Sequence, residues 1–83
     1  MDVKQEVINV LSTVLNLGAR TASFTSETRL LGSVPELDSM AVVSVITALE
    51  ERFGFAIDDD DIDGSTFATI GSLVEFVNRK LAF

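Results

Sequence analysis

Asp38 and Ser39 are the adjacent residues in this chain whose types and position could support a chemical modification. They stand where a loop that contains Pro35 gives way to a run with helical periodicity. A serine in the first turn of a helix is exposed, and the unpaired N–H groups and positive dipole end stabilise a phosphodiester attached to it. The pair therefore fits a phosphate-linked modification site. Taken alone, it is more often an ordinary helix cap.

The chain lacks the side chains that most enzymes use, because it contains no histidine, cysteine, tyrosine or tryptophan. A Ser–His or Cys–His catalytic pair is therefore impossible. General acid–base chemistry would fall to carboxylates and lysines alone. We predict a protein that is not itself an enzyme and whose chemistry comes from a partner or a prosthetic group.

A run of aspartates resembles the opening of a calcium-binding loop, with Asp59, Asp61, Asp63 and Gly64 in matching positions. The twelfth position of such a loop requires a bidentate glutamate, and here it is Ile70. We therefore predict no dedicated metal site. Weak divalent binding at the three aspartates, which would relieve their mutual repulsion, stays open.

Composition restricts the class of protein further. The 83 residues fit one domain, spanning 1–83, and the 47% hydrophobic content suffices for a compact core. The formal charge of -7 disfavours nucleic acid and anionic membranes, and it favours partners with basic patches. The chain lacks the pattern of a signal peptide, and no run approaches the roughly 18 apolar residues that span a bilayer. We expect a cytoplasmic, unprocessed protein without membrane insertion.

Hydrophobic residues at three- and four-residue steps predict three longer helices. The first runs from Val3 to Leu17, with Asp2 and Gln5 as a capping box, and stops at Gly18. The second runs from Ser39 to Phe53, with Asp38 as N-cap and Gly54 just past its end, and its inner face holds Val42, Ile46, Leu49 and Phe53.

The last helix follows Thr69 as N-cap and reaches Leu81, and a short helix over 59–63 precedes it, stopped by Gly64. Residues 18–38 form a loop whose length suggests function. A helical turn is expected over 25–31, and the residues that pin this loop to the core are Leu30, Leu31, Val34 and Leu37. The predicted fold is all-α: a small four-helix bundle of three longer helices and one short helix, monomeric because every apolar stripe can be buried within it.

These motifs together resemble the acyl carrier protein family across essentially the whole chain. The family places Asp-Ser-Leu or Asp-Ser-Met at the start of its second helix, which it ends in Leu-Glu-Glu-x-Phe. An isoleucine and an acidic short helix follow, and the last helix opens with Thr-[Val/Ile]-Gly and a leucine. The matching segments here are Asp38-Ser39-Met40, Leu49-Glu50-Glu51-Arg52-Phe53, Ile57 with residues 58–61, and Thr69-Ile70-Gly71 with Leu73.

The resemblance implies that Ser39 carries a phosphopantetheine arm, which a phosphopantetheinyl transferase takes from coenzyme A. The thiol of the arm would then carry acyl groups as thioesters between acyl-activating, acyltransferase or synthase enzymes. By the same analogy, Asp38 could contact the magnesium that accompanies the phosphate donor. Two alternatives remain: a peptidyl or aminoacyl carrier, and an unmodified helical interaction module.

The exposed side of the second helix is the expected partner-recognition surface, formed by Met40, Val43, Ser44, Thr47, Glu50 and Glu51. Housekeeping fatty-acid carriers have acidic residues two and five positions after the serine, where this chain has Ala41 and Ser44. We therefore expect a specialised carrier, serving for instance a polyketide, lipid or cell-envelope glycolipid pathway. The resemblance also implies an acyl chain between the helices, with Ile46, Ile57, Ile62, Ala68 and Ile70 as candidate lining. The six phenylalanines are expected as core and loop anchors.

Overall fold

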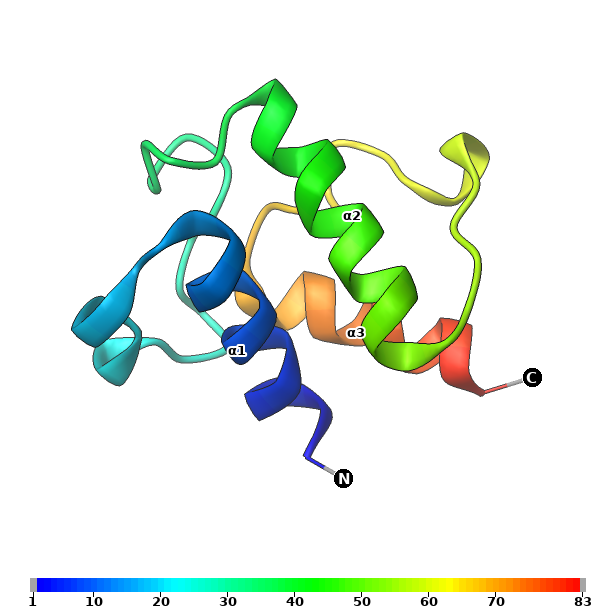
Figure 1. Ribbon diagram of the computed structural model, residues 1–83, viewed down its shortest axis with the longest axis horizontal. Helices are drawn as coiled ribbons and strands as arrows, with labels where there is room; N and C mark the ends of the chain where they lie inside the picture. The colour runs from blue at the N-terminus through cyan, green and yellow to red at the C-terminus, as the bar shows by residue number, and fades with distance from the viewer. Residues whose placement is uncertain (1, 83) are drawn as a thin grey trace.

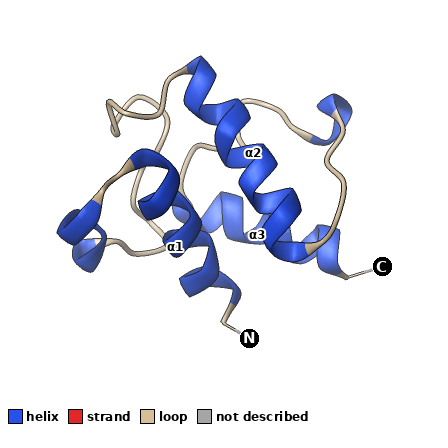
Figure 2. Ribbon diagram, in the orientation of Figure 1, coloured by secondary structure: helices blue, strands red, loops and turns tan. Residues whose placement is uncertain are grey.

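The structure, a computed structural model, describes residues 2–82, except for the side chain of Asp59. It contains three α-helices, α1 (Val3–Leu15), α2 (Ser39–Phe53) and α3 (Ile70–Leu81), and two short 3-10 helices, η1 (Gly18–Ser23) and η2 (Asp59–Asp61). Helices are joined by long loops, and no strand is assigned within 2–82 (Figure 2). The backbone of α1 approaches both α2 and α3, and α3 crosses behind α2 in the view of Figure 1. The predicted all-α bundle is confirmed.

The first helix is shorter than predicted at its C-terminal end. Asp2 caps it as expected, accepting a hydrogen bond from the Gln5 N–H, but the Gln5 side chain bonds to Asn9 instead of closing a capping box. The last residue of the helix is Leu15, and the C-cap Asn16 adopts a left-handed conformation with φ 56°. Asparagine tolerates this region almost as glycine does, so α1 stops before the predicted Leu17 and Gly18.

The boundaries of α2 and α3 are those predicted. Gly54 ends α2 with φ 76°, a left-handed conformation that glycine adopts without strain. Thr69 caps α3 by accepting a hydrogen bond from Ser72 N–H, and the Ser72 hydroxyl accepts one from Thr69 N–H in return. This reciprocal pair satisfies two N–H groups that the first turn of a helix leaves free.

The loop between α1 and α2 is extended where a helical turn was predicted. Within residues 25–31 the chain forms a single tight turn, with Thr28 N–H donating to the carbonyl of Thr25. Beyond it, Arg29 pairs with Thr69 in an isolated antiparallel bridge. Backbone hydrogen bonds continue on both sides of this bridge, from Leu30 to Ala68, from Leu31 to Phe67, and from Ile70 and Gly71 to Thr28 and Ser26.

The core differs from the prediction at two points. Leu30, Val34 and Leu37 anchor the loop as expected, but Leu31 is 49% exposed, because the extended backbone turns its side chain outward. On α2 the most buried residues are Val45 and Leu49, whereas Val42, Ile46 and Phe53 are only half-buried. The buried stripe of α2 is therefore centred on Val45, which the predicted inner face omitted.

Two other expectations concern the phenylalanines and the short helix. Phe67 and Phe76 are buried, Phe24, Phe53 and Phe55 are half-buried, and Phe83 lies outside the described residues. The short helix covers only Asp59–Asp61 as a single 3-10 turn and does not reach Asp63. Within residues 2–82, none of the helices has the length and apolar character needed to cross a membrane.

Candidate functional site

The junction that carries Asp38 and Ser39 lies at the exposed N-terminal end of α2 (Figure 1). Ser39 is the first residue of the helix and is exposed to solvent. Oδ1 of Asp38 accepts a hydrogen bond from Ala41 N–H over 2.8 Å, and the Asp38 carbonyl accepts one from Val42 N–H over 2.9 Å. The predicted N-cap is confirmed. The serine hydroxyl is presented where a modifying enzyme can reach it.

The segment leading into this junction is held from inside by two apolar side chains. Val34 is 6% exposed and Leu37 is 4% exposed, and Leu37 N–H donates to the carbonyl of Val34. Asp38 N–H donates to the Glu36 carbonyl over 3.1 Å. The turn over 34–38 therefore fixes the position of Asp38 relative to the core.

On the outer side, Glu36 forms a bidentate ion pair with Arg20 of η1. The two terminal guanidinium nitrogens each donate to one carboxylate oxygen, and the Nη2–Oε1 distance is 2.8 Å. The hydrogen bonds from Arg20 are the main reason why the pKa of Glu36 falls from its usual 4.5 to about 2. The pair is thus charged on both sides at any physiological pH.

The side of α2 on which we predicted partner recognition is largely exposed, and its first exposed residues are apolar. Met40 is 77% exposed and Val43 is 59% exposed. Ser44 and Thr47 are exposed, and their hydroxyls donate to the carbonyls of Met40 and Val43 one turn earlier. Glu51 is exposed near the end of the helix.

Glu50, the other acidic residue expected on this surface, is half-buried and already has a partner. Its Oε2 accepts a hydrogen bond from Ile57 N–H over 2.8 Å. The Glu50 carboxylate therefore fixes the chain that follows α2. Sequence periodicity could not indicate this role, because the contact depends on how residues 54–57 turn back.

Comparison with known proteins bears on this serine-bearing junction and its helical scaffold. A family model described as a phosphopantetheine attachment site matches residues 5–77. The solution NMR structure of a holo acyl carrier protein from Nitrosomonas europaea superimposes with a TM-score of 0.92, at 55% sequence identity and with 100% of both chains covered. The chain belongs to the acyl carrier protein family.

Two further acyl carrier proteins are similar over nearly the whole chain. One, from Thermotoga maritima, is 25% identical over 83 residues, which are 98% of this chain and 99% of the relative. Another, from Acidothermus cellulolyticus, is 29% identical over 76 residues, or 89% and 87% of the two chains. Family membership confirms the predicted carrier function, and with it phosphopantetheine as the covalent prosthetic group.

In this member of the acyl carrier protein family, two carboxylates of the acidic segment, those of Asp61 and Asp63, accept hydrogen bonds from within the chain. Asp61 accepts from Asp58 N–H and Lys80 Nζ, each at 2.9 Å, and these two donors lower its pKa. Asp63 accepts from the hydroxyl and the N–H of Ser65, which likewise lower its pKa. No group of three or more metal-ligating side chains is found among the residues described. Weak divalent binding there stays a prediction.

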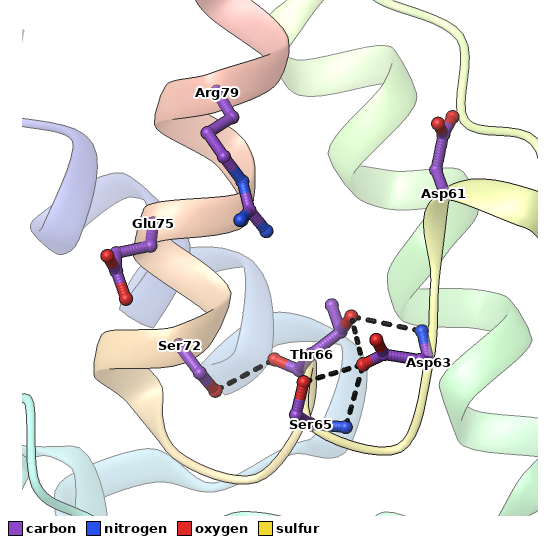
Figure 3. A pocket seen from close by; sticks show the side chains of 7 residues that line it. All are labelled: Asp61, Asp63, Ser65, Thr66, Ser72, Glu75 and Arg79. Atoms are coloured by element: carbon purple, nitrogen blue, oxygen red, sulfur yellow. Dashed lines mark hydrogen bonds between the residues drawn. The ribbon is translucent and has the colours of Figure 1, made fainter.

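A cavity of about 350 Å³ lies between the segment after η2 and α3, and it is polar (Figure 3). Its lining consists of Asp61, Asp63, Ser65, Thr66, Ser72, Glu75 and Arg79. None of the five acyl-lining candidates borders it. Ile70 is fully buried, Ala68 is exposed, and the other three, Ile46, Ile57 and Ile62, are half-buried side chains that pack on the core.

Proposed function

We propose that Ser39 is the residue that bears the phosphopantetheine arm. The observation that carries this proposal is the exposed Ser39 hydroxyl at the first residue of α2, directly after a residue that caps the helix. Two other exposed serines flank it, Ser33 in the preceding loop and Ser44 on the helix. Neither of them stands at the start of a helix of eight or more residues.

The helix terminus explains why a phosphodiester suits this position. Asp38 accepts from the third and fourth N–H groups after it, those of Ala41 and Val42. In the part of the chain that is described, the N–H groups of Ser39 and Met40 donate to no protein group. These two groups and the positive end of the helix dipole favour a negative charge next to the serine oxygen.

The modification needs a separate enzyme, because this chain has no histidine or cysteine with which to activate a hydroxyl. The Ser39 oxygen would form a bond to the pantetheine phosphate of coenzyme A, the nucleotide would leave, and the serine proton would pass to the transferase.

Asp38 lies directly before the reacting residue and could contact the magnesium of the donor. Since the donor is an intracellular metabolite, we place the modification in the cytoplasm. The terminal thiol of the arm supplies the thioester chemistry.

Intact mass after incubation with coenzyme A, magnesium and a broad-specificity phosphopantetheinyl transferase tests this proposal. We expect one added arm on the wild-type protein, none on Ser39→Ala, and one on the matched control Ser33→Ala. Folded wild-type protein that gains no mass would overturn the proposal and favour the unmodified interaction module. Loading of the holo protein with an amino acid instead of an acyl group would favour the peptidyl carrier.

We also propose that this carrier is specialised rather than housekeeping. Support comes from the surface next to Ser39, where Met40 and Val43 are exposed and Ala41 and Ser44 replace acidic residues. Basic docking patches gain little from such a surface, because electrostatic complementarity requires opposite charges. The proposed partners are therefore acyl-handling enzymes with an apolar contact opposite Met40 and Val43, and with basic residues opposite the exposed Glu51 near the other end of α2.

A housekeeping ketosynthase provides the test of specialisation. We expect it to turn over the acylated wild-type protein slowly, and to turn over the Ala41→Glu/Ser44→Glu double variant faster. Turnover of the wild-type protein at the rate of a housekeeping carrier would contradict specialisation.

The acyl chain itself is proposed to pack near Ile46, Ile57 and Ile62, whose side chains are half-buried against the core.

A further inference from the structure

The segment that presents Ser39 has one long-range polar tether. Within the described residues, the hydrogen bonds that residues 32–38 form join residues close in sequence. The exception is the pair between Arg20 and Glu36, which are 16 residues apart. The segments that hold the two residues, η1 and the loop that enters α2, lie on the same side of the molecule in Figure 1.

Both ends of the tether are anchored. Arg20 follows Leu17, which is 3% exposed, and Arg20 N–H donates to the Leu17 carbonyl. Glu36 lies between the buried side chains of Val34 and Leu37, and its carbonyl accepts the Asp38 N–H. The ion pair therefore connects η1, which follows α1, to Glu36, two residues before the N-cap, and the backbone at both ends is held in place.

We propose that Arg20 and Glu36 are positioning residues for arm attachment: their ion pair holds the loop before Asp38 in the conformation that the transferase recognises. This inference rests on the proposed attachment at Ser39. The buried leucine and valine hold the segment toward the core, and the ion pair fixes its outer side. Without the pair, residues 35–38 sample further conformations, and only a fraction of the molecules present Ser39 correctly.

A conformational role of this kind predicts a particular kinetic pattern. When only a fraction of a substrate is competent, its apparent affinity falls by that fraction, while the bound complex reacts as before. Because an exposed ion pair is a weak contact, we expect the KM for the carrier to rise about two- to fivefold, with kcat unchanged. The Ser39 hydroxyl itself is untouched.

The chain supplies a matched control. Arg52 pairs with Glu6 through two hydrogen bonds to one carboxylate oxygen, at the opposite end of α2. The arginine side chains of the two pairs are 50% and 53% exposed and the glutamate side chains 37% and 25%, so solvent screens both pairs. Loss of either pair removes a comparable exposed contact, and only one of them lies beside Ser39.

The experiment measures transfer of the arm to the apo protein at fixed ionic strength, with intact mass as readout. We expect Arg20→Gln and Glu36→Gln each to raise the KM, and the charge-swapped Arg20→Glu/Glu36→Arg to return it toward wild type. The two single variants change net charge in opposite directions, so charge steering would move their KM values in opposite directions. Arg52→Gln should leave the KM unchanged.

A second readout is independent of the transferase. Amide hydrogen exchange at Leu37 and Asp38 should become faster in Arg20→Gln and stay at the wild-type rate in Arg52→Gln, because only the first variant loosens the 34–38 turn. The inference would be overturned if both single variants kept the wild-type KM, or if their KM values shifted in opposite directions. It would also be overturned if the charge-swapped variant had a KM as high as that of the single variants. Failure of the Ser39 assignment would be recognised separately, as an arm still added to Ser39→Ala.

Discussion

The carboxylate of Glu50 accepts a hydrogen bond from the backbone N–H of Ile57, with 2.8 Å between Oε2 and the nitrogen. The carbonyl of Glu50 also accepts the N–H of Gly54, the residue that ends α2. One residue therefore holds both sides of the turn over 54–57. This turn directs the chain into the acidic segment. Phe55 in the turn stacks on Phe53, the last residue of α2, with ring centroids 5.8 Å apart.

Replacement of Glu50 should consequently lower stability, although the residue lies on the side of α2 expected to face partners. Glu50→Ala leaves the partly buried Ile57 N–H without its acceptor, and we expect a loss of about 1–2 kcal/mol in the free energy of unfolding. Urea denaturation measures it. The exposed neighbour gives the control, since Glu51→Ala should change stability by less than about 0.5 kcal/mol. Equal effects of the two substitutions would contradict the role assigned to Glu50.

Gly71 should be intolerant of a side chain because the loop before α2 passes close to it. A Cβ at this position would lie 2.8 Å from the Ser26 carbonyl oxygen, which also accepts the Gly71 N–H over 2.8 Å. Gly71→Ala must push the two segments apart, and we expect a cost of about 1–3 kcal/mol in thermal or urea unfolding. Gly64→Ala is the matched control, because nothing lies within 4 Å of its Cβ. A free energy of unfolding that is unchanged in Gly71→Ala would show that residues 26–28 can shift freely.

The features that sequence predicted correctly are those encoded by neighbouring residues. Asp38 and Gly54 specify the ends of α2, and Thr69 specifies the start of α3, because caps act within one turn of the helix. The extended segment around Arg29 is different. Its backbone is held by residues 67–71, about 40 positions along the chain, and such pairing overrides the local preference for a turn.

The same distinction applies to the site. Exposure of Ser39 follows from its place at a loop–helix junction, so sequence could indicate it. The tether between Arg20 and Glu36 and the contact between Glu50 and Ile57 have no periodic signature, because each depends on how an irregular segment returns to a helix. Charge complementarity between Arg20 and Glu36 was visible in the sequence, but only the fold brings the two together.

Asp38 should have separable effects on folding and on arm attachment. Asp38→Ala removes the cap that accepts Ala41 N–H, and we expect a loss of about 1 kcal/mol in urea unfolding. Asparagine caps as well as aspartate, so Asp38→Asn should keep the wild-type stability. If the carboxylate also contacts magnesium in the transferase complex, Asp38→Asn should still slow attachment and raise the magnesium concentration required. Wild-type attachment kinetics in Asp38→Asn would leave Asp38 with a capping role alone.

Acid should weaken the tether to the attachment segment within a defined pH window. The pKa of Glu36 falls from its usual 4.5 to about 2 through the hydrogen bonds from Arg20, so the folded protein holds the carboxylate charged where the unfolded chain would protonate it. A depressed pKa in the folded state contributes stability that is fully present above pH 4.5 and is lost as pH falls toward 2. NMR titration of the Glu36 side-chain carboxyl should give a midpoint near 2 in wild type and one closer to 4.5 in Arg20→Gln. The stability of wild type relative to Glu36→Gln should fall across the same window, and a wild-type midpoint at the usual value would show that the pair is not formed in solution.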